Sequence, residues 1–452
     1  MNIYEPLNIR NIALLGHAGS GKTTLSESIL FESGSITRRG TVEEKSTQSD
    51  HTEIEQERGC SIYLTPLFAE FKNTKINILE APGYTDYFGE SVAAISTADV
   101  SFIVFNAQNK IEVGAENCWE ETVKTKKPVV FIINKLDLDQ AKFDDTVQDI
   151  RDSYGKSATI FQYPVKTGAG FNAIIDVFRN KLFTYPTGGG KAQEADIPDS
   201  EKSKAEKLRS ELIESIAETD EALMANYFEN GELTDDEIKV GLKRAIINRL
   251  IFPIFASAGK ANIGIDSILN FIIDFIPSPA EMPFAKSKDG KEVACSVSSP
   301  VSVFVFKLSS EAHLGDMTFF KMFSGKLNEG TDLYNEQKST VDRFNQLFIT
   351  CGKKRIEVPT LCAGDIGSTV KLKSTQINHT LHDKNLSVEF PEIVFPNPRV
   401  RVAIVPKTKG EEEKVGMGLH ALCLEDHSLK LEHSQELRQM ILYSQGELHQ
   451  AV

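Results

Sequence analysis

The sequence lacks several features that would assign it to a special class of protein. None of its apolar runs approaches the roughly 18 residues that a membrane-spanning helix needs. Its six cysteines are scattered, with no CxxC pair and no histidine nearby at zinc spacing, which argues against a disulfide framework and a metal knuckle. The amino terminus, MNIYEPLNIR, has no basic and then apolar secretory pattern. We therefore expect a cytoplasmic protein with free thiols and no membrane contact.

Positive charge is also in short supply. The chain has 50 Lys and Arg against 64 Asp and Glu, which gives a formal net charge of −14. Proteins that bind nucleic acid through its phosphates gain affinity because Lys and Arg release counterions. This balance argues against binding to DNA and against general affinity for RNA, so any RNA contact must be local or lie outside this sequence. At 452 residues the chain is too long for a single core, and we expect two to four domains.

Residues 9 to about 163 have the pattern of an α/β domain. Short apolar runs, from NIALLG near the start to TIFQY at 159–163, alternate with amphipathic stretches. Such alternation is typical of βα units, which build a mostly parallel sheet with helices on both faces. Ligands bind at the carboxyl ends of the strands in these sheets. The Gly and Thr cluster at 16–24 stands where the first strand is expected to turn into the first helix.

The alternation breaks after Tyr163 and resumes at FPIFASAG, residues 252–259. Between these points we expect a Gly-rich loop at 188–190 and two charged helices at about 200–228 and 234–248. Surface loops of a domain tolerate insertions of this kind. The pattern therefore predicts one α/β domain whose insertion returns the chain to an adjacent strand.

The residues after about 280 have a different pattern of apolar and polar residues. Beyond a proline-rich linker, short alternating runs such as VSVFVFKL and FFKMFSGKL predict a small β-barrel. A second proline cluster precedes a strand, a helix and a further strand. The predicted domains are residues 1–280 with an α+β insertion at about 164–250, a β-barrel at 281–392 and a partial α+β third domain at 393–452. Because the chain stops at GELHQAV without a cap or tail, we expect the sequence to be a fragment.

The strongest motif is GHAGSGKT, which fits GxxxxGK[ST] after a strand and before a helix. Its glycines let backbone N–H groups converge on a β-phosphate, and the helix amino terminus adds the positive end of its dipole. Lys22 would reach the β- and γ-phosphates, and the Thr23 hydroxyl would bind Mg²⁺. The alternative is a Gly-rich turn that binds nothing. The predicted nucleotide-binding residues here are Gly16, His17, Ala18, Gly19, Ser20, Gly21, Lys22, Thr23 and Thr24.

A second motif, NKLD, follows the apolar run PVVFII. The Asp137 carboxylate can accept hydrogen bonds from N1–H and the N2 amine of guanine, a donor pair that adenine lacks. Asn134 would tie neighbouring loops together, and the stem of Lys135 would lie along the base. The tetrapeptide alone is a weak signal, but about 110 residues after a P-loop it predicts GTP and GDP as ligands.

A third motif, EAPGY at 80–84, follows the apolar run INIL. P-loop proteins carry an acidic residue at this place, so Glu80 is expected to contact Mg²⁺ through water. Gly83 would offer its N–H to the γ-phosphate. That contact exists only when the third phosphate is present, so it would order a loop in one nucleotide state and release it in the other.

With these motifs the chain resembles elongation factor G, a GTPase of translation, over essentially all 452 residues. The resemblance includes EIEQERGCSIYLTP at 53–66, which is similar to the first switch loop of that family, and VAIVPKTKGEEEKV in the third domain. It implies a ferredoxin-like third domain, a ribosomal partner and a role in translocation. It also implies that Ser257 and Ala258 lie in the loop that faces the guanine O6.

Three departures from the family pattern mark a divergent paralogue. Tyr84 stands where the family has a histidine that orients the attacking water, and a phenol cannot carry positive charge beside the developing phosphate charge. Ser61 stands in place of the threonine that binds Mg²⁺, which keeps the hydroxyl but loses the methyl that stiffens the rotamer. Gly19 replaces the usual aspartate of the P-loop.

We therefore expect a GTP-binding, Mg²⁺-dependent factor, a monomer that contacts ribosomal RNA and ribosomal proteins. Tyr84 is the candidate catalytic residue, and Thr23, Ser61 and Glu80 are the candidate metal ligands. Three alternatives stay open: a ribosome-protection or ribosome-release GTPase, a GTP-bound ribosome ligand that does not hydrolyse, and a P-loop enzyme unrelated to translation.

Overall fold

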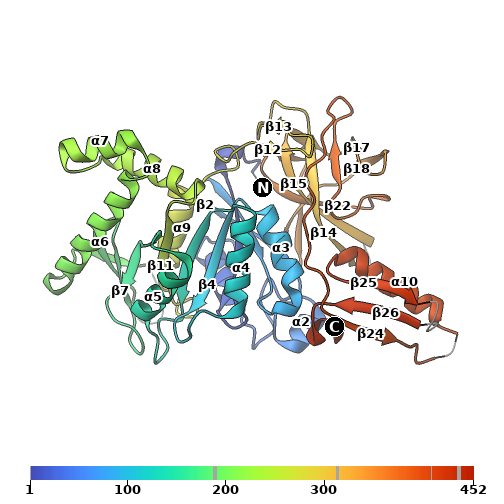
Figure 1. The fold of residues 1–452 in the computed structure, drawn as a ribbon, viewed down its shortest axis with the longest axis horizontal. Helices are drawn as coiled ribbons and strands as arrows, with labels where there is room; N and C mark the ends of the chain where they lie inside the picture. Colours follow the sequence, from blue (N-terminus) through green and yellow to red (C-terminus); the bar gives the residue numbers. More distant parts are fainter. Residues whose placement is uncertain (1, 187–190, 312–314, 409, 435–438) are drawn as a thin grey trace.

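The computed structural model describes residues 2–186, 191–311, 315–408, 410–434 and 439–452, and Figure 1 shows its fold. The predicted Gly-rich loop at 188–190 lies outside these residues. The insertion lies at one end of the molecule, and the barrel and third domain lie at the other. The central domain is built on a seven-stranded sheet. In spatial order its strands are β2 (Thr65–Phe71), β3 (Thr74–Glu80), β1 (Ile9–Leu15), β4 (Val100–Asn106), β5 (Val129–Asn134), β11 (Phe252–Ala256) and β6 (Ala158–Ile160).

The sheet is parallel except for its edge strand β2, which pairs antiparallel with β3. β1 and β5 are buried along their whole length, as expected for strands covered on both faces. The strand order reverses at β1, where the crossovers to β3 and β4 run in opposite directions. Right-handed crossovers therefore place α1 and α3 on opposite faces, and the ligand crevice is expected at the carboxyl end of β1.

The helices pack in pairs on this sheet. α1 packs against α9, and α3 packs against α4, which crosses the near face in Figure 1. The helices of this domain are η1 (Pro6–Asn8), α1 (Lys22–Glu32), α2 (Glu53–Arg58), η2 (Thr85–Tyr87), α3 (Phe88–Thr97), α4 (Val113–Lys124), α5 (Phe143–Tyr154) and α9 (Ile265–Phe275). Among the described residues, no helix is long and apolar enough to cross a membrane.

The prediction of a single strand at 159–163 is wrong, because the chain changes sheets at Phe161. β6 ends before it and β7 begins after it, while the Phe161 ring packs against Phe255 and Phe271 with centroids 5.8 and 5.5 Å away. β7 starts an antiparallel sheet, which forms the β part of the predicted α+β insertion; its individual strands were not predicted, since they have only three or four residues. Its strands are β7 (Gln162–Pro164), β8 (Ala173–Asp176), β9 (Lys181–Thr184) and β10 (Gln193–Ala195).

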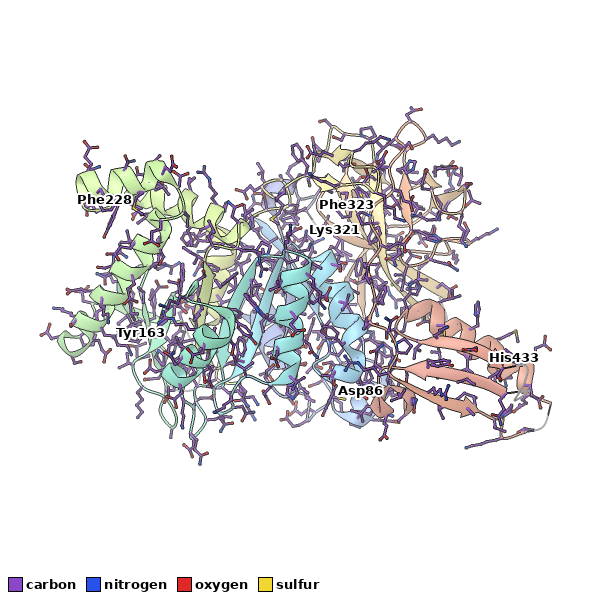
Figure 2. The ribbon with its side chains drawn as sticks, in the orientation of Figure 1. Asp86, Tyr163, Phe228, Lys321, Phe323 and His433 are labelled. Atoms are coloured by element: carbon purple, nitrogen blue, oxygen red, sulfur yellow. The ribbon has the colours of Figure 1, made fainter. Side chains whose placement is uncertain are left out.

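The long helix predicted at 200–228 is two helices. Asp220 interrupts it by accepting hydrogen bonds from the N–H groups of Ala222 and Leu223, which starts a new helix. The helices of the insertion are α6 (Asp199–Ala217), α7 (Glu221–Asn230) and α8 (Asp235–Ile247). Phe228 lies on α7 at the far end of the insertion, and Tyr163 lies at its base (Figure 2). The chain then returns to β11, which pairs with β6 as the predicted insertion requires.

The second domain is the predicted β-barrel. Its main sheet, in spatial order, has β18 (Thr340–Phe344), β17 (Thr331–Asn335), β23 (Thr380–His382), β14 (Ser302–Glu311), β15 (Gly315–Ser324), β22 (Ile366–Val370), β19 (Phe348–Cys351) and β20 (Lys354–Glu357). Two pairs accompany it: β16 (Lys326–Asn328) with β21 (Thr360–Cys362), and β12 (Ala285–Lys286) with β13 (Glu292–Val293). The run predicted as one strand at 319–327 breaks at Gly325, whose φ is +81°.

Within its described residues, the third domain has three antiparallel strands and one long helix. The strands are ordered β24 (Val400–Ile404), β26 (Gln439–Ser444) and β25 (Lys430–Ser434), and the helices are α10 (Glu412–Glu425) and the short α11 (Glu447–Gln450). α10 contacts strand β14 of the barrel as well as β25.

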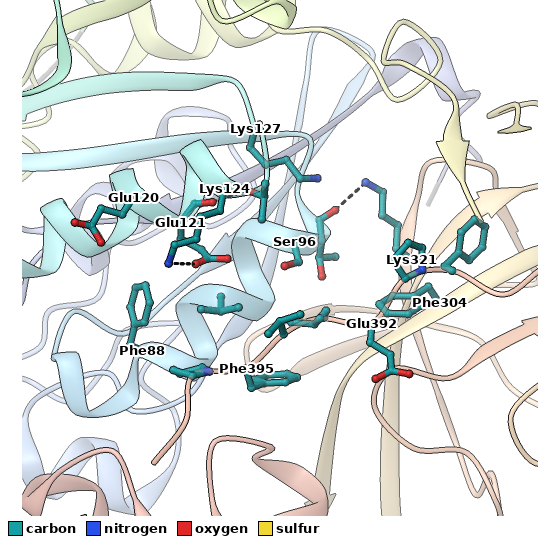
Figure 3. A pocket seen from close by; sticks show the side chains of 18 of the residues that line it. Phe88, Ser96, Glu120, Glu121, Lys124, Lys127, Phe304, Lys321, Glu392 and Phe395 are labelled. Carbon is teal, nitrogen blue, oxygen red and sulfur yellow. Dashed lines mark hydrogen bonds and ion pairs between the residues drawn. The ribbon is translucent and has the colours of Figure 1, made fainter. Parts of the chain in front are cut away.

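Buried ion pairs join the barrel to the central domain. Lys75 of β3 lies 2.6 Å from Asp365, and Lys321 of β15 lies 2.6 Å from Asp99. All four side chains are at most 7% exposed. Figure 2 locates Lys321 and Phe323 at this junction, and Figure 3 shows the neighbouring cavity of about 860 Å³ between α3, α4, the barrel and residues 390–399.

Candidate nucleotide-binding site

The phosphate-binding motif occupies the turn from β1 into α1, at the carboxyl end of the sheet. Two of its glycines are required by the backbone. Gly16 has a φ of +136°, and a Cβ there would lie 2.3 Å from the carbonyl oxygen of Val104. Gly21 has a φ of +95°, and a Cβ would lie 2.5 Å from the side-chain nitrogen of Asn134. The turn joins the first strand to the first helix as the sequence predicts, and it packs the motif against Val104 of β4 and Asn134 of β5.

A pocket of about 460 Å³ opens above this turn. The predicted site residues that line it are Ala18, Gly19, Gly21, Lys22, Thr23, Thr24, Ser61, Gly83, Tyr84, Asn134, Lys135 and Asp137. The predicted residues Gly16, His17, Ser20, Glu80, Ser257 and Ala258 lie behind the wall. The other lining residues belong to none of the three predicted motifs, and they are Val42, Glu43, Asp50, Gly59, Cys60, Leu138, Gly259 and Lys260.

Lys22 lies beneath the phosphate-binding turn. Its ammonium donates hydrogen bonds to the carbonyl oxygens of Gly16 at 2.9 Å and His17 at 3.1 Å. Burial lowers the pKa of this ammonium, and the nearby Glu80 carboxylate opposes that shift. A bound phosphate would add a full negative charge at the same place, which favours the charged lysine.

Gly83 packs directly on the same turn. The N–H of Ala18 donates to the carbonyl oxygen of Gly83 at 3.0 Å. A Cβ on Gly83 would lie 2.5 Å from both the Ala18 nitrogen and the Lys22 ammonium nitrogen. Only glycine fits here, so the segment that follows β3 lies within contact distance of the phosphate position.

Asn134 connects the turn to the loop after β11. Its Nδ2 donates to the carbonyl oxygen of Ser20 at 3.0 Å. Its Oδ1 accepts from the Ser257 hydroxyl at 3.2 Å and from the N–H of Gly259 at 2.9 Å. This is the bridging arrangement expected from the sequence. It holds Lys135, which has a φ of +65°, at the wall of the pocket.

The loop after β11 reaches the pocket through residues other than the two that the family resemblance names. Ser257 and Ala258 are fully buried, and the N–H of Ala258 donates to the carbonyl oxygen of Ile263 at 3.1 Å. Gly259 and Lys260, the next two residues, line the pocket. The physical reason is the Asn134 bridge, which turns Ser257 inward and leaves the following residues at the surface.

The candidate metal ligands Thr23, Ser61 and Glu80 lie close together. The Thr23 hydroxyl donates to Glu80 Oε1 at 2.6 Å and lies 3.3 Å from the Ser61 hydroxyl. Ser26 donates to the other oxygen of Glu80 at 2.5 Å. Glu80 is 1% exposed, and it stands behind Thr23, a position suited to contact through water.

Asp50 was not predicted as a site residue, because it lies in a polar loop outside any motif. It lines the pocket and is 4% exposed, yet its Oδ2 has no hydrogen-bond partner among the described residues. Burial, and then the Glu80 carboxylate, raise the pKa of Asp50 to about 7. A buried carboxylate oxygen without a partner, on a residue that lines the same pocket as Thr23 and Ser61, fits a hard cation such as Mg²⁺, which takes one or two carboxylates together with phosphate oxygens.

Tyr84 lines the pocket and is 40% exposed, at the residue before η2.

His17 supports the structure around the turn. Its Nδ1 accepts the N–H of Gly114 at 3.1 Å, and its Nε2 lies 3.8 Å from Glu112, so it holds the start of α4 against the turn.

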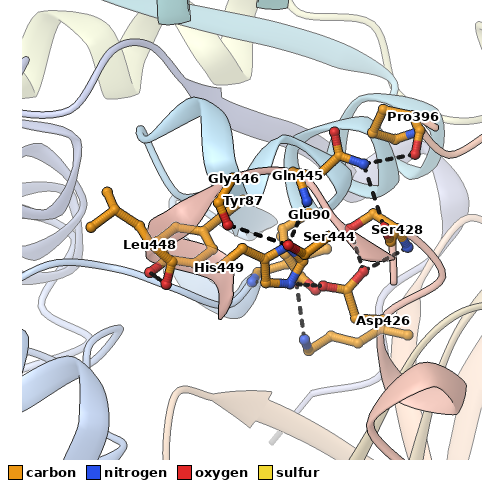
Figure 4. Close-up of polar contacts among 12 residues, drawn as sticks. Tyr87, Glu90, Pro396, Asp426, Ser428, Ser444, Gln445, Gly446, Leu448 and His449 are labelled. Atoms are coloured by element: carbon orange, nitrogen blue, oxygen red, sulfur yellow. Dashed lines mark hydrogen bonds and ion pairs between the residues drawn. The ribbon is translucent and has the colours of Figure 1, made fainter. Parts of the chain in front are cut away.

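The segment after Tyr84 contacts the third domain (Figure 4). Asp86 accepts the N–H of Leu448 at 2.9 Å, and the Tyr87 hydroxyl donates to the Leu448 carbonyl oxygen at 3.3 Å. His449 packs edge-on against Tyr87 and lies 3.0 Å from Asp426. The loop that contacts the phosphate position is thus continuous with a contact between domains.

Three family models match the chain in the same order as its domains. The model "Elongation factor Tu GTP binding domain" matches residues 7–278, "Elongation factor G domain 2" matches 300–384, and "Elongation Factor G, domain III" matches 395–452. The first covers more than half of the chain. The fold, the pocket and this match define a protein with the GTP-binding domain of the translation factors.

The two further domains narrow the assignment, and the chain belongs to the elongation factor G family. It is 33% identical to elongation factor G of Mycoplasma pneumoniae over 448 residues, which are 98% of this chain and 65% of the relative. It also superposes on a crystal structure of a Thermus thermophilus protein with a TM-score of 0.88 and 30% identity, again over 98% of this chain and 65% of that one. The chain therefore spans about 65% of the length of these relatives.

Proposed function

We propose that this protein binds GTP and GDP with Mg²⁺ and acts on the ribosome as a nucleotide-dependent switch in translocation. The observation that carries the nucleotide assignment is the Asn134 bridge. It fixes the phosphate-binding turn, the NKLD segment and the loop after β11 around one pocket, with Lys22 and Asp137 both on its wall.

Each side of the pocket has a separate role in the proposal. The backbone N–H groups of the turn and the Lys22 ammonium bind the β- and γ-phosphates. Asp137 accepts two hydrogen bonds from guanine. Thr23 and Ser61 supply hydroxyl ligands for Mg²⁺, with Glu80 contacting it through water and Asp50 offering its unpaired oxygen. When bound, Mg²⁺ neutralises charge between the phosphates.

Hydrolysis is proposed to be weak. Tyr84 lines the pocket and stands in the sequence where the family has its water-orienting histidine, and a tyrosine hydroxyl can donate one hydrogen bond to a water and accept another. It cannot place a positive charge next to the phosphate oxygens as they become more negative. The general-base and electrostatic contributions that a histidine would supply are therefore missing from this residue.

The contacts of Asp86 and Tyr87 support a route from the nucleotide to the third domain. Gly83 lies at the phosphate position, and three residues later Asp86 binds the backbone of Leu448. A γ-phosphate that repositions Gly83 would change this interface. We propose that the two nucleotide states differ in how the third domain is held.

The proposed partners are ribosomal RNA and ribosomal proteins, with the protein acting in the cytoplasm as a monomer. The match to two domains of elongation factor G favours translocation over ribosome protection or ribosome release. A GTP-bound ribosome ligand that does not hydrolyse stays the second candidate, because Tyr84 replaces the usual histidine.

The test is single-turnover GTP hydrolysis by the full-length protein, with and without ribosomes, for the parent and for Tyr84→His. We expect the parent to remain near the rate of an unassisted GTPase, on the order of 10⁻⁴ s⁻¹. Tyr84→His should gain ribosome-stimulated turnover. Strong stimulation of the parent would contradict the weak-hydrolysis proposal, and binding of ATP as tightly as GTP would contradict the nucleotide assignment.

A further inference from the structure

A short loop at residues 40–48, between α1 and α2, forms part of the pocket wall. Val42 and Glu43 at its tip line the pocket. The loop closes on itself, since the N–H of Ser46 donates to the carbonyl oxygen of Thr41 at 3.1 Å. No sequence motif marks this loop, and none of its residues was predicted to belong to the site.

Glu27 of α1 holds both ends of this loop. One carboxylate oxygen accepts the N–H of Gly40 at 2.8 Å, and the other accepts the N–H of Gln48 at 2.5 Å. Glu27 is 1% exposed. Within the part of the chain that the structure describes, it has no ion-pair partner, so these backbone groups satisfy its buried charge. Hydrogen bonds to a charged acceptor are stronger than neutral ones.

The barrel supports the loop from its other side. Gly352, in the turn between β19 and β20, donates its N–H to the carbonyl oxygen of Pro66 at 3.1 Å. A Cβ on Gly352 would lie 1.7 Å from the carbonyl oxygen of Gln48. The barrel backbone therefore touches Gln48 directly, and Glu27 and Gly352 enclose it between them.

The position of Gln48 also bears on the metal side of the pocket. Ser49 follows it, and the Ser49 carbonyl oxygen accepts the Thr65 hydroxyl at 3.2 Å. The next residue is Asp50, which lines the pocket and whose Oδ2 has no hydrogen-bond partner among the described residues. Asp50 is thus only two residues from the clamped position, and displacing Gln48 would displace this candidate ligand.

We propose that Glu27 and Gly352 form a clamp that holds loop 40–48 against the nucleotide pocket and slows the departure of bound nucleotide. Both are positioning residues, since neither lines the pocket. The inference rests on the proposed nucleotide binding. It makes a barrel residue a determinant of nucleotide retention in the neighbouring domain.

The experiment measures dissociation of N-methylanthraniloyl-GDP from the full-length protein by stopped-flow fluorescence after a chase with excess GDP. In Glu27→Gln an amide NH₂ faces one of the two backbone N–H groups, so one hydrogen bond is lost and no negative charge remains. We expect release at least tenfold faster, which corresponds to about 1.4 kcal/mol. The matched control is Glu44→Gln, because Glu44 lies in the same loop but its ion pair is with exposed Arg38.

The second arm changes the barrel side of the clamp. Gly352→Ala places a methyl group against Gln48 and should also accelerate release. Gly330→Ala is its control, because Gly330 has a similar left-handed φ of +77° but its Cβ would meet nothing nearer than Arg343 at 3.5 Å. The control therefore carries the same backbone strain without touching the loop.

The readouts separate this clamp from the function on which it depends. A parent that binds no guanine nucleotide would overturn the proposed function. A parent that binds nucleotide, with both clamp variants releasing it at the parental rate, would overturn the clamp alone. Equal acceleration by Glu44→Gln or Gly330→Ala would also overturn it. Limited trypsin digestion should show faster cleavage after Arg39 and Lys45 in the clamp variants, and if Glu27→Gln does not fold, Gly352→Ala decides the question.

Discussion

At the scale of single residues, base recognition in the proposed site depends on Asp137. Its carboxylate lies on the pocket wall, two residues beyond the strained Lys135. The surrounding backbone is fixed, since the N–H of Leu136 donates to the carbonyl oxygen of Ser257 at 3.2 Å. A side chain on such a rigid segment can select between bases by its hydrogen-bond pattern alone.

Asp137→Asn should therefore change nucleotide preference rather than fold. The amide cannot accept from both N1–H and the N2 amine of guanine, so GTP affinity should fall by roughly 100-fold or more. Xanthine has a carbonyl oxygen in place of that amine, which the amide N–H can donate to, so xanthosine triphosphate should bind the variant better than GTP does. Competition against a fluorescent nucleotide measures both affinities, and an unchanged preference for GTP would place the base elsewhere.

The site residues that could be predicted from the sequence differ in how they act from those that could not. The phosphate-binding turn, Asn134 and Glu80 belong to motifs, because their chemistry requires fixed spacing along the chain. Glu27 acts through contacts with a segment distant in sequence, and Asp50 acts through its burial. The sequence alone reveals neither property for a carboxylate on a helix or in a polar loop. Tyr84 was located by the motif, yet the motif does not fix the direction of its exposed side chain.

At the scale of elements, the strands that were predicted well are those buried on both faces. β1, β4 and β5 are near-continuous apolar runs, as central parallel strands must be. The edge strand β2 was not recognised, and only its first two residues, Thr65 and Pro66, fall in the region interpreted as a switch loop. The splits at Phe161 and Asp220 escaped prediction because a ring packed into the core and a side-chain cap decide them, and neither alters the local apolar pattern.

The turn between β22 and β23 in the barrel carries a pH-dependent contribution to stability. His379 Nδ1 accepts the N–H of Gln376 at 3.0 Å, which requires that nitrogen to be unprotonated. Burial, and then the charge of Lys338, lower the pKa of His379 to about 4. In the unfolded chain its pKa is about 6.5. The unfolded state therefore binds more protons between these values, and the contribution is present above pH 6.5 and lost as the pH falls toward 4.

His379→Asn should remove this dependence. The Asn oxygen can accept the same N–H but does not titrate, so the variant should lose less stability on acidification. Because Asn is smaller than the buried His379 ring, the variant is also expected to be less stable at pH 7. Urea unfolding at pH 7, 5.5 and 4.5 gives the slope of the unfolding free energy against pH for each protein. The carboxylates titrate in both proteins, so a difference between the two slopes comes from His379. Parallel slopes would mean that His379 is accessible to protons in the folded barrel.

At the scale of the whole molecule, the barrel and the central domain are joined by charge rather than by apolar surface alone. Asp365 accepts from Lys75 at 2.6 Å and from Asn77 at 3.0 Å. Asn11 donates to both Asp99 and the carbonyl oxygen of Gly364. Buried charges of this kind must stay paired, so separating the two domains would expose or orphan each of them. We expect the two domains to move as one body when the nucleotide changes.

The only tryptophan tests this coupling, because Trp119 lies in α4 of the central domain, stacked on Tyr154 at 4.6 Å. Asp365→Asn changes only the barrel, yet it leaves the Lys75 ammonium buried without its carboxylate. The unfolding free energy reported by Trp119 fluorescence should fall by about 3 kcal/mol.

Adding Lys75→Met to Asp365→Asn removes the orphaned charge, so the double variant should recover most of that loss. The matched control is Asp332→Asn, which breaks an exposed barrel pair with Arg343 and should change the free energy by less than about 0.5 kcal/mol. If the Trp119 transition does not respond to Asp365→Asn, the barrel does not stabilise the central domain through this pair. The expectation of a single moving body would then fail with it.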